Sequence, residues 1–243
     1  AARQSIIDTY GWVIEDVGLA PGCQNSDELT PITNANIRQA VNNWVSDPSA
    51  ATTTYGAIST WDVSQVTDMS DLFRNTSFND DISNWDVSNV IDMSGMFRSA
   101  SSFNQDISAW NVSNVTTMFR TFLDASAFNQ PLNNWNVSNV TDTIGMFQNA
   151  TSFNQNLNSW NVSSVTNMNN MFGSAIAFDG NISSWDVSNV IDMSWMFYNA
   201  TSFNGDLSAW DVSNVTHMEY MFRSTSSFNQ DIGSWDVSSI THM

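Results

Sequence analysis

A phrase of the form Trp-Asp/Asn-Val-Ser recurs eight times along this chain of 243 residues. Its tryptophans are 24 residues apart once and 25 residues apart six times, at Trp61, Trp85, Trp110, Trp135, Trp160, Trp185, Trp210 and Trp235. A fixed period between about 20 and 50 residues is typical of a solenoid, in which each repeat buries its apolar face against its neighbours. The period therefore predicts one elongated domain whose function lies on a repeated surface.

Two apolar periods follow each other within a repeat. Trp85 and Val87 lie two residues apart, as inward residues of a strand do, whereas Met93, Met96 and Phe97 step by three and four, as residues on one helix face do. We therefore expect an α/β repeat solenoid with one short parallel β-strand and one short helix or helical turn in each repeat of about 25 residues.

The apolar columns run unbroken from repeat to repeat. One phenylalanine column has a constant period of 25 residues, at Phe78, Phe103, Phe128, Phe153, Phe178, Phe203 and Phe228. A solenoid built of near-identical layers needs the same apolar residue at the same inward position. The phenylalanines and the eight repeated tryptophans are therefore predicted to form the core, and no cofactor site is expected among them.

A polar column lies between the inward tryptophan and valine of each repeat, so it points away from the core. It is the best-ordered exposed array of the chain and our predicted binding surface, and it comprises Asp62, Asp86, Asn111, Asn136, Asn161, Asp186, Asp211 and Asp236. Each of these residues is followed two positions later by serine, which is expected to hydrogen-bond the backbone where the strand turns.

The chain divides into three segments by this pattern. They are an N-terminal segment at 1–32, a capping helix with its lead-in at 33–57, and the repeats at 58–243, of which the last is incomplete. Ile37 and Val41 mark the apolar stripe of the expected cap helix, Thr33 or Asn34 can cap its start, and Pro48 prevents its continuation. The last repeat stops before its helical part, so we expect more repeats or a further domain after it, or end-to-end self-association through an apolar face.

The charge of the chain limits the classes of partner that it is expected to bind. The chain has six arginines, no lysine and 24 acidic residues, which gives a formal net charge of −18. Binding to nucleic acid and to anionic membranes needs clustered basic residues, so both are excluded as expected partners, and no apolar run is long enough to insert in a membrane. Basic proteins, cations and neutral glycans stay open.

Several features indicate an extracellular protein. The chain begins at Ala1 without a methionine, as expected of a processed secreted protein or of a trimmed fragment. Asn75, Asn149 and Asn199 are candidate glycosylation sites because each begins an Asn-x-Ser/Thr sequence. Cys23 is the only cysteine, so it cannot form a disulfide within this sequence.

The phrase Trp-Asp-Val-Ser-Asn-Val-(Thr/Ile)-Asp-Met-Ser-x-Met-Phe, followed by Ser-Phe-Asn-Gln-Asp-Ile-Ser, resembles the BspA-like leucine-rich repeat family, also described as the bacterial surface protein 26-residue repeat. The resemblance covers about residues 58–243. It implies a leucine-rich-repeat-like solenoid, secreted or displayed on microbial cells, with a role in adhesion and in contact with host or matrix. It carries over no catalytic residues.

The sequence leaves several functions open. The favoured one is a non-enzymatic structural or adhesive protein that contacts protein or glycan through the repeated strand face, as a building block of a surface layer or filament. No cofactor is expected, although calcium bound by the aspartate column is an alternative. A glycoside hydrolase that uses stacked carboxylates such as Asp186 and Asp211, a dyad of His217 and His242, and an ice-binding threonine column are weaker hypotheses.

Overall fold

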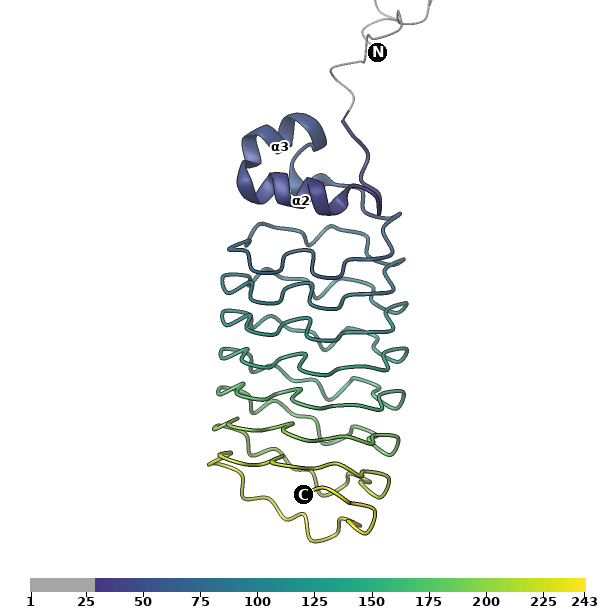
Figure 1. Ribbon diagram of the computed structural model, residues 1–243, viewed down its shortest axis with the longest axis vertical. Coiled ribbons are helices and arrows are strands. Elements are labelled where there is room, and N and C mark those ends of the chain that lie inside the picture. The colour runs from purple at the N-terminus through teal and green to yellow at the C-terminus, as the bar shows by residue number, and fades with distance from the viewer. Residues whose placement is uncertain (1–28) are drawn as a thin grey trace, which may run out of the picture.

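The computed structural model describes residues 29–243. The coils of the chain lie one on another along the long axis of the molecule, and the two α-helices, α2 (Ile37–Ser46) and α3 (Pro48–Tyr55), cover one end of the stack (Figure 1). A short 3-10 helix, η1 (Ile58–Thr60), leads into the first coil. The expectations for Cys23 and for the rest of residues 1–28 lie outside the described residues.

The helix α2 lies where the apolar stripe predicts a helix, but its start differs from the expectation. Asn36 precedes the first helical residue, and its side-chain oxygen accepts hydrogen bonds from Thr33. Asn34, expected as a cap, instead joins the helical end to the first coil. Its amide donates to the hydroxyl of Thr67 at 2.8 Å, and its oxygen accepts the Thr67 N–H at 2.9 Å.

The end of α2 is set by Asp47 and Pro48. Asp47 has an extended backbone, and its side chain accepts the N–H of Ala50 at 3.0 Å, which caps the start of α3. Proline at the first position of α3 has no N–H to lose there. Trp44 of α2 meets Trp61 of the first coil edge to face at 6.1 Å between ring centroids, so α2 packs on the end of the aromatic core.

The predicted inward columns form the core. Phe97 stacks on Phe122 of the next coil at 5.5 Å and on Phe103 of its own coil at 4.0 Å between centroids, and all three are fully buried. The repeated tryptophans from Trp61 to Trp210 are buried too and Trp235 is partly buried, and they carry hydrogen bonds between coils. The indole N–H of Trp110 donates to the carbonyl of Ile82 in the preceding coil at 3.1 Å, and the same bond recurs at Trp85, Trp135, Trp160, Trp185, Trp210 and Trp235.

The predicted fold class is wrong in its elements. Within residues 29–243 the repeats contain no β-strand and no α-helix, so the chain is not a leucine-rich-repeat-like β/α solenoid. The parallel β-bridges between adjacent coils, such as that between Asp68 and Asp92, are isolated and do not extend into strands. The two α-helices within residues 29–243 precede the repeats.

The strand is absent because turns leave no room for it. The N–H of Trp85 donates to the carbonyl of Ile82, and the N–H of Val90 donates to that of Val87, so both donors close local turns instead of pairing with a neighbouring strand. Trp85 and Val87 do point inward, and both are buried. Over so short a segment, inward and outward side chains can alternate without the hydrogen-bond ladder of a β-sheet.

The helix is absent because residues in the left-handed region interrupt it. Gly95 has φ of 60° and Ser99 has φ of 56°, values that an α-helix does not contain. Between 93 and 100, every second N–H donates to the next coil, as Phe97 does to Thr121, and the others close turns. We call 93–100 and its equivalents the turn ribbon, at 69–76, 118–125, 143–150, 168–175, 193–200 and 218–225.

Candidate functional site

The predicted polar column is exposed in every coil, and each member closes a turn. Its side-chain oxygen accepts the N–H of the serine two residues later, at 3.0 to 3.2 Å. Aspartate and asparagine both make this bond, which explains why they alternate freely along the column. The column thus has a structural role in the coil.

The carboxylates of this column have lowered pKa values. The hydroxyl of Ser188, at 2.6 Å, and its N–H, at 3.1 Å, hold the pKa of Asp186 below its ordinary value of 3.8, while the neighbouring carboxylate of Asp211 opposes the shift. In the other coils that have aspartate at this position, the equivalent serine lowers the pKa of Asp62, Asp86, Asp211 and Asp236 in the same way. Each turn is therefore strongest when its aspartate is ionised.

These shifts predict a loss of stability in acid. A carboxylate whose pKa is lowered in the folded state stabilises the fold above its unfolded pKa, and this stabilisation disappears as the pH falls through the folded pKa. We expect the melting temperature to decline as the pH drops below the ordinary value of 3.8. Replacing Asp62, Asp86, Asp186 and Asp211 by asparagine, as in the middle coils, should make this decline shallower. Equal declines in wild type and variant, followed by circular dichroism, would contradict the assignment.

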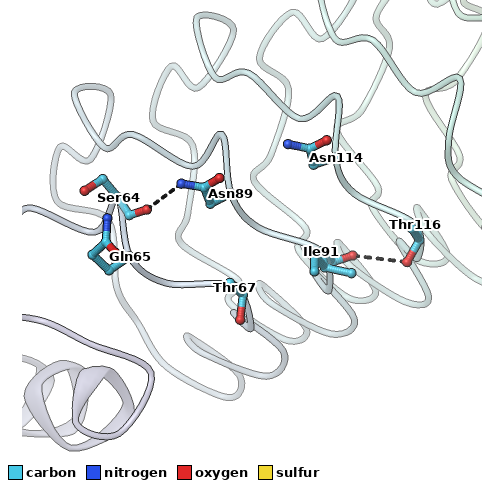
Figure 2. Close-up of a pocket in the computed structure, with 7 residues that line it drawn as sticks. All are labelled: Ser64, Gln65, Thr67, Asn89, Ile91, Asn114 and Thr116. Carbon is cyan, nitrogen blue, oxygen red and sulfur yellow. Dashed lines mark hydrogen bonds between the residues drawn. The ribbon is translucent and has the colours of Figure 1, made fainter.

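A groove of about 440 Å³ lies beside the polar column in the first three coils (Figure 2). Its lining comes from three neighbouring columns and comprises Ser64, Gln65, Thr67, Asn89, Ile91, Asn114 and Thr116. We call it the polar groove. The side chain of Ile91 is half exposed, so the groove combines amide and hydroxyl groups with one apolar surface.

Hydrogen bonds between coils hold the polar groove in shape. The amide of Asn89 donates to the carbonyl of Ser64 at 2.9 Å, and the hydroxyl of Thr116 donates to the carbonyl of Ile91 at 3.4 Å (Figure 2). The amide of Asn114 donates in the same way to Ser88 at 2.7 Å. The asparagine position thus joins each of these coils to the preceding one.

The chemistry of the lining suits an uncharged polar ligand. None of its residues is acidic or basic, and Gln65 makes no side-chain hydrogen bond within residues 29–243. Amides and hydroxyls both donate and accept hydrogen bonds, as a saccharide or a peptide backbone requires. The predicted Asp/Asn column does not line this groove, and binding at that column stays a prediction.

The candidate glycosylation sites differ in their surroundings. Asn75 is exposed, whereas Asn149 and Asn199 are half buried. The amide nitrogen of Asn149 donates to Asp124 at 2.8 Å, and that of Asn199 donates to Ser174 at 3.4 Å. Because a glycan would attach at this nitrogen, the environment favours Asn75 over the other two.

The two histidines lie beside each other in successive coils. The rings of His217 and His242 are stacked at 4.5 Å between centroids, and each Nδ1 lies within hydrogen-bond distance of the threonine before it. Within residues 29–243, no three acidic, histidine or cysteine residues gather as a metal site would require. Calcium binding by the aspartate column stays an alternative, checked by the melting temperature with and without a chelator.

The last described coil exposes an apolar surface. A hollow of about 330 Å³ there is lined by residues that include Met221, Trp235 and Met243. Self-association through this surface stays a prediction. The α-helices α2 and α3, which are the only ones among residues 29–243, lack the length and hydrophobicity of a bilayer-spanning helix.

Comparison with known proteins identifies one family. A family model described as "Mycoplasma protein of unknown function, DUF285" matches residues 39–160 and 142–243. Comparison with curated proteins and with solved structures finds no match.

Proposed function

The chain belongs to the DUF285 family, and on that premise we propose that it is a non-enzymatic, extracellular or cell-surface protein that contacts protein or glycan through the polar groove. The observation that carries the proposal is the lining of the groove, which brings uncharged amides and hydroxyls from three successive coils to one surface. Such groups hold a ligand by hydrogen bonds and apolar contact.

The rigidity of the stack supports a role in holding a binding surface in a fixed shape for a ligand. Side chains and backbone groups link each coil to the next, so that the amides of Asn89 and Asn114 occupy equivalent positions. A surface that is fixed before binding loses little conformational entropy when it binds. The same stack serves as a building block of a surface layer or filament if coils of separate molecules meet end to end.

The sequence resemblance supports the location and the adhesive role. The repeated Trp-Asp-Val-Ser phrase is similar to BspA-like repeats, which implies display on microbial cells and adhesion to host or matrix. The net charge of −18, with no lysine, favours neutral or basic partners over nucleic acid and anionic lipid.

The proposal predicts that filling the groove weakens binding. Ile91 is half exposed in the groove, so arginine at this position should occupy the space of the ligand without disturbing the core. Binding of the purified chain to immobilised matrix proteins and to a neutral glycan array identifies the strongest probe. We expect Ile91→Arg to weaken binding to that probe about tenfold, which corresponds to about 1.4 kcal/mol, as measured by biolayer interferometry.

A matched control exists in the same column. Ile191 is also half exposed but does not line the groove, so Ile191→Arg adds the same charge elsewhere on the same face and should leave binding unchanged. Equal loss in both variants would overturn the assignment to the groove. Absence of binding by the wild-type chain to every matrix protein and glycan would overturn the proposed function.

A further inference from the structure

The outward positions of the turn ribbon differ from coil to coil, unlike the inward ones. The first left-handed position of the ribbon is occupied in turn by Asp71, Gly95, Arg120, Gly145, Asn170, Trp195 and Tyr220. The inward phenylalanine columns of the same coils keep one residue type. Because the stack does not dictate the outward residue, a residue there is free to serve a ligand.

Three of these residues, Arg120, Trp195 and Tyr220, sit where their side chains are unfavourable, and two of the three are aromatic. Trp195 has φ of 61° and Tyr220 has φ of 56°, a region that glycine, asparagine and aspartate tolerate and that bulky residues avoid. Gly145 and Asn170 hold the same position in earlier coils. Backbone strain of this kind gathers at functional sites, so the aromatic residues at this position require an explanation outside the fold.

The aromatic rings form one surface across two coils. The ring of Trp195 lies 4.6 Å from that of Tyr220 and 4.9 Å from that of Tyr198, between centroids. The guanidinium of Arg223 lies 5.1 Å from the centroid of Tyr220. Trp195 and Tyr198 are half buried and Tyr220 is 49% exposed, in contrast to the tryptophans of the core. We call these three rings the aromatic patch.

The polar atoms of the patch have no partner in the described part of the chain. Within residues 29–243, neither the indole N–H of Trp195 nor the hydroxyls of Tyr198 and Tyr220 make a hydrogen bond, whereas the core tryptophans donate theirs between coils. Next to the patch, the carboxylate of Glu219 accepts the hydroxyl of Ser194, and this bond lowers the pKa of Glu219. The hydroxyls of Tyr198 and Tyr220 can each donate and accept a hydrogen bond, and the indole N–H of Trp195 can donate one. The carboxylate of Glu219, held by Ser194, can accept one.

We propose that the aromatic patch binds a neutral saccharide. Tryptophan and tyrosine present an apolar face with a polar edge, which matches the C–H face and the hydroxyl edge of a sugar ring. Arg223 and Glu219 oppose each other in charge, so the patch does not select a charged ligand. The patch lies on the turn ribbon of the coils that begin at Trp185 and Trp210, and it is separate from the polar groove of the first three coils. The inference therefore does not depend on the proposed function.

The test uses a substitution that the fold itself suggests. Asn170 shows that asparagine suits this left-handed position, so Trp195→Asn should keep or raise the melting temperature while removing the central ring. The probes are neutral oligosaccharides of glucose, galactose, mannose and N-acetylglucosamine on an array, and the strongest is then titrated by calorimetry. We expect the wild-type chain to bind at least one of them and Trp195→Asn to weaken that binding at least tenfold.

The controls separate this site from the rest of the stack. Arg120→Asn changes the same ribbon position outside the patch and should leave saccharide binding unchanged. Failure of the wild-type chain to bind any of the four series would overturn the proposal, as would unaltered binding in Trp195→Asn. Binding of a proline-rich peptide in place of the saccharides, lost in Trp195→Asn, would also overturn it.

Discussion

Replacing Phe147 by alanine should lower the free energy of unfolding by about 3–5 kcal/mol. The side chain is fully buried. Its ring stacks on Phe122 at 5.5 Å, on Phe172 at 5.6 Å and on Phe153 at 4.1 Å between centroids, so alanine leaves a cavity that touches three coils. Because neighbouring coils on both sides hold the cavity open, the core should relax little. Urea denaturation followed by circular dichroism measures the loss.

Two further variants test whether the loss comes from the cavity. Phe147→Leu keeps most of the volume and should be clearly less destabilising. Phe222 occupies the same column but is only partly buried, so Phe222→Ala should lower the free energy of unfolding by less than Phe147→Ala does. A loss below about 1 kcal/mol for Phe147→Ala, which is the size expected of an average substitution, would contradict the stacked core.

The core could be predicted from the sequence because every coil needs an apolar residue at the same inward position. A residue that lies between identical neighbours above and below must be apolar in every coil, and Phe103, Phe128 and Phe153 satisfy this with a constant spacing. Burial of these residues and of the repeated tryptophans confirms the prediction of an inward aromatic core. The period and the direction of the side chains are enough to predict this core, whatever backbone conformation lies between the inward residues.

The conformation of the backbone could not be predicted from the same apolar pattern. Steps of three and four residues, as at Met93, Met96 and Phe97, arise in a helix and equally in consecutive turns, because each turn also spans three residues. The discriminating signal was the residue type at two fixed positions of the ribbon. Glycine and asparagine recur there, as at Gly145 and Asn149, and both favour the left-handed region that ends a helix.

The candidate sites were only partly readable. The exposure of the Asp86 column followed from its place between two inward residues, but its hydrogen bonds to serine show that the column serves the turn. The groove needed the neighbouring coil, since the partner of Asn89 lies 25 residues away. In the sequence, the residues of the aromatic patch appear only as departures from the repeat. Whether their rings lie close together depends on the register between coils, in which the N–H of Trp195 donates to the carbonyl of Glu219 at 2.8 Å.

Replacing Trp135 by alanine should also lower the free energy of unfolding by about 3–5 kcal/mol, and Trp135→Phe should divide that loss into two parts. The indole N–H donates to the carbonyl of Ile107 in the preceding coil at 3.0 Å, and the ring packs 6.5 Å from Trp110 between centroids. Phenylalanine keeps an aromatic ring but removes the donor. The carbonyl of Ile107 retains the N–H of Trp110, so the lost bond should account for about 1 kcal/mol.

Trp195→Ala provides the comparison, because this tryptophan belongs to the aromatic patch and donates no side-chain hydrogen bond within residues 29–243. Its removal should change the free energy of unfolding by less than about 1 kcal/mol, as is usual for surface positions. Equal losses for Trp135→Ala and Trp195→Ala in urea denaturation would show that the core tryptophans do not join the coils. A large loss at Trp135 alone would distinguish the tryptophans that hold the stack together from the one that is free to bind a ligand.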